Sequence, residues 1–153
     1  MNLKDNSFYR ADLILHGIDP SGISYEGRIF FNHPDANPDT PTTLENGYAG
    51  SFSIFGHGGC YGNVGHCTPR TGMRSFDKRP KSPVESRDIP VIVTDALKQV
   101  LLNSQELEVT IVPIVRPENA DFIKQIQPDV DTEHCLKFDK FEIALYDAPQ
   151  SSA

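Results

Sequence analysis

Two histidines and two cysteines lie close together in one glycine-rich turn. They are His57, Cys60, His66 and Cys67, in the stretch GHGGCYGNVGHC over residues 56–67. Imidazole and thiolate are ligands of tetrahedral zinc, and the soft thiolates also suit Cu(I). The spacing is not that of a zinc finger, and the glycines raise the entropic cost of closing a site. The turn is therefore a candidate copper or zinc site in a chain that requires no cofactor to fold.

Other interpretations of this turn stay open. Cys60 and Cys67 can be small buried residues or a disulfide, with the histidines hydrogen-bonded to backbone. A thiol near an imidazole also permits a redox or reactive role. The pair His134 and Cys135 repeats the dipeptide of the turn, and it would complete a site only if the fold brought the two segments together.

Composition limits the functions that remain. The 153 residues suffice for one domain with its own core, so we expect a single β-domain over residues 1–153. The net charge of −7, without a basic stripe, argues against nucleic acid as a partner. The N-terminus is charged and no window approaches about 18 apolar residues, so we expect neither a secretory signal nor a membrane span. These features predict a cytoplasmic protein.

Strand patterns dominate the elements that would carry the turn. Alternating or apolar runs predict strands over 11–18, 25–31, 48–55, 106–115 and 136–146. The sequence DPSG between the first two runs predicts a hairpin, with Asp12 and His16 facing water. Pro113 predicts an edge strand or a bulge.

Loops and one helix complete the prediction. Residues 32–47 form a polar loop, and residues 68–90 form a long proline-rich loop. Thr94 can cap a short helix that ends near Asn103. Strands with regular turns and one short helix favour a mainly β fold, an antiparallel β-sandwich or barrel with one short helix.

The order of these segments resembles a known family. The pentapeptide YAGSF (48–52), the histidine and glycine turn, the Leu-containing helix, the strand EVTIVPIV and the final strand KFEIALY are similar to the C-terminal β-domain of type-3 copper proteins. That family includes plant polyphenol oxidases, tyrosinases and molluscan hemocyanins. The resemblance covers residues 8–146, although Tyr48 replaces the more usual Phe, and the copper-bearing helical domain has no counterpart in this chain.

The resemblance implies a non-catalytic accessory β-domain whose partner is a type-3 copper oxidase module. The dinuclear copper site of that family uses six imidazoles and this chain has five histidines, so we expect no enzyme activity from it alone. In the family, a side chain from the β-domain can cover the entrance to the copper site. Tyr61 and Phe55 are the candidates for such a plug, and Tyr61 is the better one because its ring resembles a phenolic substrate. The alternatives are an independent copper- or zinc-binding protein resembling a metallochaperone, and a metal-free structural protein that self-associates as a homo-oligomer.

Overall fold

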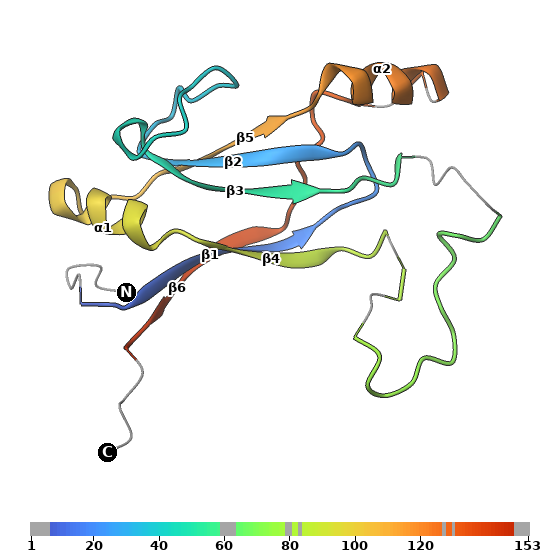
Figure 1. Cartoon of the computed structure of the whole chain (residues 1–153), viewed down its shortest axis with the longest axis horizontal. Coiled ribbons are helices and arrows are strands. Elements are labelled where there is room, and N and C mark those ends of the chain that lie inside the picture. Colours follow the sequence, from blue (N-terminus) through green and yellow to red (C-terminus); the bar gives the residue numbers. More distant parts are fainter. Residues whose placement is uncertain are drawn as a thin grey trace.

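The strands form two three-stranded antiparallel sheets (Figure 1). The computed structural model describes residues 7–58, 64–78, 81–82, 84–126, 128–129 and 131–148. Sheet A has the order β4-β1-β6 and sheet B the order β3-β2-β5. The strands are β1 (Arg10–Ile18), β2 (Tyr25–Phe31), β3 (Tyr48–Ile54), β4 (Arg87–Ile92), β5 (Val109–Ile114) and β6 (Lys140–Tyr146). The helices are α1 (Thr94–Asn103), α2 (Pro117–Ile126) and the short 3-10 helix η1 (Leu44–Asn46). The predicted antiparallel, mainly β sandwich is confirmed, and the described residues form no closed barrel.

The core lies between the two sheets. Alternate residues of a strand point to opposite faces, and those that point inward here are large and apolar. Leu13 and Leu15 of β1 and Ile29 of β2 have no exposed surface, and they belong to one cluster of buried residues. Leu97 of α1 joins the same cluster, so the helix closes one end of the core.

The two sheets approach each other along β3 and β4, which lie side by side in Figure 1. Gly50 in the middle of β3 has a φ of +146°, and a Cβ built on it would lie 2.9 Å from Cγ1 of Val91. A residue without a side chain is therefore needed where β3 passes β4. On the opposite side of the sandwich, β5 and β6 each have only one strand neighbour among the described residues.

The polar loop that follows β2 folds back on the outer face of sheet B. Arg28 Nη1 donates a hydrogen bond to the Pro38 carbonyl oxygen at 3.2 Å, and the Phe30 ring contacts the ring of His33 in an edge arrangement. Phe30 is completely buried although its neighbours Ile29 and Phe31 point into the core. The loop thus covers part of a sheet face that would otherwise expose an aromatic ring.

Three sequence predictions about these elements are wrong. The segments 11–18 and 25–31 do not form a hairpin, because β1 lies between β4 and β6 while β2 belongs to the other sheet. Asp12 does not face water, since only 3% of it is exposed beneath the side chain of Arg10. Thr94 does not cap α1: its hydroxyl accepts a hydrogen bond from the Ala11 N–H at 3.0 Å and so attaches the helix to β1.

The start of one strand differs from the prediction, and one helix was not predicted. Residues 87–90, expected to be loop, begin β4, and α2 was not predicted. The position of Pro113 on an edge strand is confirmed, because β5 pairs with β2 alone. None of the helices in the described ranges is long and apolar enough to cross a membrane.

Candidate functional site

The end of β3 is fixed to the segment that links β1 and β2. The Gly56 N–H donates to Ser24 Oγ at 3.0 Å, and the His57 N–H donates to the Pro20 carbonyl oxygen at 2.9 Å. Gly56 lies so close to this segment that a Cβ on it would overlap the Gly22 carbonyl oxygen. The backbone directly after β3 is therefore held on both sides of Gly56.

Phe55 projects from this fixed strand end. Its side chain is 76% exposed, and its ring meets the His57 ring edge-on with centroids 5.5 Å apart. An exposed aromatic ring on an anchored backbone is suited to contact with another molecule, because little conformational freedom remains to be lost. Of the two predicted plug residues, Phe55 thus has the exposure that the role needs. Tyr61 lies outside the described residues.

The two histidines of the predicted metal site are near each other. The rings of His57 and His66 have centroids 6.2 Å apart, and His57 Nδ1 is buried without a hydrogen-bond partner in the described part of the chain. Cys67 Sγ lies 3.5 Å from Nε2 of the adjacent His66. Cys67 is disulfide-bonded, whereas Cys135 is a free thiol. A disulfide sulfur is not a thiolate, so Cys67 would bind metal only after reduction.

The structure leaves the metal prediction untested. Cys60, the remaining predicted ligand, lies outside the described residues. Within residues 7–58, 64–78 and the other described ranges, no group of three or more His, Cys, Asp or Glu side chains could hold a metal ion. His57, Cys60, His66 and Cys67 therefore stay a predicted site, with the two imidazoles as its described part.

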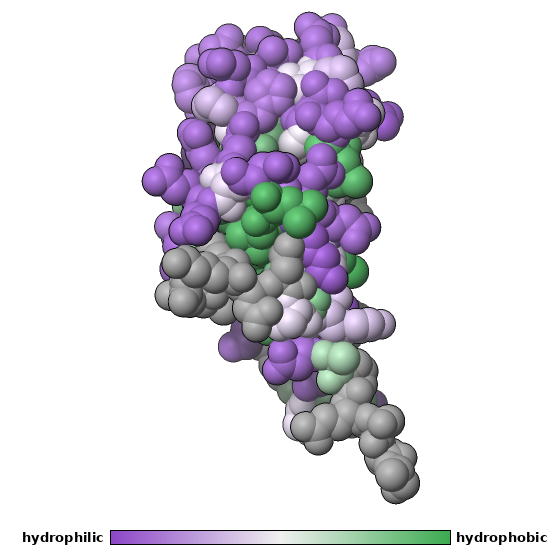
Figure 2. Space-filling view, turned by 90° about the vertical axis from the view of Figure 1, so that its left-hand side faces the viewer, coloured by the Kyte–Doolittle hydropathy of each residue, from purple (hydrophilic) through white to green (hydrophobic). Residues whose placement is uncertain are grey.

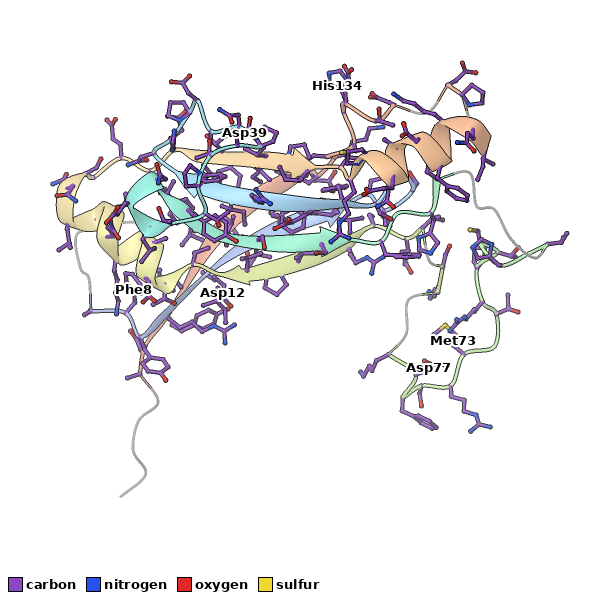
Figure 3. All side chains as sticks on the ribbon, turned by 45° about the horizontal axis from the view of Figure 1, so that its top comes forward. Phe8, Asp12, Asp39, Met73, Asp77 and His134 are labelled. Atoms are coloured by element: carbon purple, nitrogen blue, oxygen red, sulfur yellow. The ribbon has the colours of Figure 1, made fainter. Side chains whose placement is uncertain are left out.

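The second His-Cys pair, His134 and Cys135, follows α2 in the chain. His134 is labelled at the top of Figure 3, and Met73, in the loop after the turn, is labelled at the lower right. His134 Nδ1 forms an ion pair with Asp131 Oδ2 at 3.2 Å. Cys135 is 6% exposed, and burial raises the pKa of its thiol. A thiol with a raised pKa remains protonated at neutral pH, which makes Cys135 a core residue rather than a nucleophile.

Sequence reasoning missed a row of charges on the outer face of sheet A. The imidazole of His16 lies between two carboxylates, with Nδ1 2.8 Å from Asp88 of β4 and Nε2 3.2 Å from Glu142 of β6. The hydrogen bond with Asp88, supported by Glu142, raises the pKa of His16. The hydrogen bond from the Gly17 N–H, together with the hydrogen bond with His16, lowers the pKa of Asp88.

An ion pair lies at the other end of this row. Arg10 Nε and Nη2 donate to both carboxylate oxygens of Asp12, at 2.7 and 2.8 Å, and the guanidinium lies over the ring of Tyr146. Figure 3 labels Asp12 beside β1. Opposite charges two residues apart on a strand share one face, and that spacing was the available signal for this pair. The row joins all three strands of sheet A.

The end of the molecule at α1 offers a second exposed apolar surface. Figure 2 faces this end and shows a small hydrophobic cluster among polar residues. Leu102 of α1 is 75% exposed, which matches the exposure of Phe55. Because α1 and the end of β3 lie at opposite ends of the sandwich in Figure 1, Leu102 is a useful control for the role of Phe55.

Comparisons with known proteins give no relative for this chain. No protein-family model, no curated protein and no solved structure matches it. Functional inference therefore depends on the residues and on the geometry of the site.

Proposed function

We propose that the chain is a non-catalytic accessory β-domain that packs on a type-3 copper oxidase module and covers the entrance to its copper site. The observation that carries this proposal is the 76% exposed Phe55 at the anchored end of β3. The pentapeptide YAGSF, on which the resemblance to the family chiefly depends, occupies residues 48–52 of the same strand.

The geometry supports a plug at this position. A side chain at the end of a rigid strand is positioned more accurately than one on a free loop. The hydrogen bonds of Gly56 and His57 fix the backbone, and the His57 ring restricts one side of Phe55. Full burial of a Phe side chain contributes roughly 1.5–3 kcal/mol, so its contact with a partner would be favourable.

Chemistry also favours a phenyl ring in this role. Phe55 has no hydroxyl group, so it can occupy the place of an aromatic substrate without being oxidised as a phenol. Bulky phenols would be excluded while the domain is bound. Tyr61 stays a second candidate for the same role.

The proposal is tested with a tyrosinase-type catalytic module that lacks its own C-terminal β-domain. We expect the wild-type chain to bind this module and to inhibit monophenol turnover. Phe55→Ala should relieve the inhibition, whereas Leu102→Ala, which removes an equally exposed side chain from α1, should inhibit as the wild type does. Complex affinity is measured in parallel by calorimetry.

Two results would contradict the proposal. Failure of the wild-type chain to bind any such module would exclude the accessory role. Binding with the same inhibition by Phe55→Ala and wild type would keep the partner but exclude Phe55 as the plug, and Tyr61→Ala would then be measured.

The neighbouring rings of His57 and His66 favour metal binding as a second candidate function. If reduced protein binds copper or zinc, binding should release protons and weaken as the pH falls through the imidazole range. Replacement of Cys60 and Cys67 by Ser should then abolish stoichiometric binding, measured as metal content after gel filtration. Retention of the metal by the double variant would place the site elsewhere.

A further inference from the structure

β6 is a regular edge strand with one open side. It pairs with β1 along its whole length, from Lys140 to Tyr146, and its register has no bulge. No other described strand lies on its second edge. An edge that is long, regular and free of proline is one that another strand can join, because its N–H and C=O groups are available for a new ladder.

The other three sheet edges are protected. β3 and β4 lie against each other, with Gly50 packed on Val91. β5 carries Pro113, which has no N–H to donate to a further strand. Among the described strands, β6 is thus the sheet edge that is neither packed against another strand nor interrupted by proline.

The apolar side chains of β6 are incompletely covered. Phe141, Ile143 and Leu145 lie opposite the buried residues Leu15, Leu13 and Ala11 of β1, so they point toward the core. Phe141 is nevertheless 45% exposed, and Ile143 and Leu145 are only partly buried. A strand added beyond β6 would extend sheet A and cover these three apolar side chains further.

We infer that the strand that joins this edge is β6 of a second copy, antiparallel to the first and related to it by a two-fold axis at Ile143. In this arrangement Ile143 lies opposite Ile143 of the second copy, and Phe141 lies opposite Leu145. On the outer face Lys140 lies opposite Tyr146, and Glu142 lies opposite Ala144. No like charges are directly opposed, and apolar residues meet apolar residues on the inner face.

This pairing uses all seven residues of β6 in both copies. The two copies of sheet A become one continuous six-stranded sheet, β4-β1-β6 joined to β6-β1-β4. A two-fold axis that lies between the two paired β6 strands gives the closed symmetry expected of a homodimer. A shift of two residues would leave Leu145 and Tyr146 without opposite partners, so the hydrophobic pattern favours the register centred on Ile143.

The inference does not depend on the proposed oxidase partner. β6 and β4 are the two edges of sheet A, and β4 is the one that lies beside β3. Dimer formation through β6 therefore leaves Phe55 accessible.

The test exploits the Glu142–Ala144 pair, which occurs twice in the symmetric dimer. The molar mass of the wild type is measured by light scattering over a concentration series, together with Ala144→Lys and Ala144→Glu. Each opposite-charge or like-charge pair across strands changes the interaction modestly, so two of them should shift the dimer dissociation constant by about 2- to 30-fold. We expect Ala144→Lys to tighten the dimer and Ala144→Glu to weaken it.

Controls separate the interface from general effects of charge. Ser51→Lys and Ser51→Glu change an exposed residue of β3 and should leave the dissociation constant of the dimer unchanged. Circular dichroism establishes that each variant is folded. A further measurement uses the unmodified protein. The amide hydrogen exchange of residues 140–146 should slow as the protein concentration rises.

Several results would overturn the inference. A wild-type chain that stays monomeric at every soluble concentration excludes the dimer. A dimer that responds equally to Lys and Glu at position 144, or that protects no amide of β6, uses another surface. Protection of β6 only after the oxidase module is added would identify that module, and not a second copy, as the occupant.

Discussion

Gly56 determines how Phe55 is presented, because its backbone lies directly against Gly22 and Ile23. Gly56→Ala should therefore destabilise the fold by about 1–3 kcal/mol, the usual range for forcing an extra carbon into a packed site. Gly22→Ala is the matched control, since a Cβ at Gly22 would meet nothing within 4 Å. Urea unfolding measures the free energy of unfolding of both variants. Equal stability of the two variants would show that the segments can move apart.

His16 should make the stability of the protein depend on pH. The carboxylates of Asp88 and Glu142 raise the pKa of His16 above its ordinary value of 6.5. A raised folded-state pKa stabilises the fold fully below the unfolded-state value, and this contribution is lost as the pH rises through the folded-state value. The stability difference between wild type and His16→Gln should thus be larger at about pH 5.5 than at about pH 9.

The pKa of His16 can also be measured directly. The His16 ring proton followed by NMR should titrate above pH 6.5, and the midpoint should fall in Asp88→Asn, because the hydrogen bond with Asp88 is the main cause of the raised pKa. A midpoint at or below 6.5 in the wild type would contradict the ion-pair arrangement. Since the pKa of Asp88 is lowered, the carboxylate remains charged throughout this range.

At the scale of elements, Thr94 attaches α1 to sheet A. Its hydroxyl accepts from the Ala11 N–H, and Ala11 is fully buried. Thr94→Val keeps the shape but leaves that N–H without its partner, which should cost about 1–3 kcal/mol of unfolding free energy. Thr94→Ser retains the hydroxyl and should lose much less. If Thr94→Val destabilised the protein no more than Thr94→Ser, the hydrogen bond to Ala11 would contribute no more to stability than the packing of the Thr94 methyl group.

Local patterns in the sequence predicted elements better than pairings. The runs over 25–31 and 48–55 match β2 and β3 within a residue, and the helix ends at Asn103 as expected. The alternation of β4 was obscured by Pro90 within a proline-rich region, and α2 was missed despite an amphipathic pattern. The supposed hairpin failed because the choice of strand neighbours depends on segments far away in the chain, which a turn signal between two strands cannot reveal.

The candidate site was predictable only in part. The exposure of Phe55 follows from strand alternation, because Phe55 shares the exposed row of Ser51 and Ser53. Its anchoring depends on Pro20 and Ser24, which no local pattern connects to it. The burial of Asp12 likewise depends on distant residues, because Ile92 of β4 and Ala144 of β6 flank it in the sheet. The predicted ligand set at residues 57–67 stays a prediction, with His57 and His66 close together.

For the whole molecule, we expect no oxidase chemistry from this chain alone. Five histidines cannot supply the six imidazoles of the dinuclear copper site in the family that the sequence resembles. After incubation with copper and gel filtration, the protein should consume no oxygen with a monophenol or a catechol. Oxygen uptake that co-elutes with the protein after metal repurification would contradict this expectation.

The central place of β1 in sheet A affects how the protein can be made. β1 leaves the ribosome well before β6, which is one of its two neighbours, and Arg10 pairs with Tyr146. Until β6 has been synthesised, β1 has at least one unpaired edge. Pairing between strands that are far apart in the sequence also forms slowly. Nascent chains that stall before residue 140 should therefore be open to chaperones and proteases, whereas chains whose β6 has left the ribosome can complete sheet A.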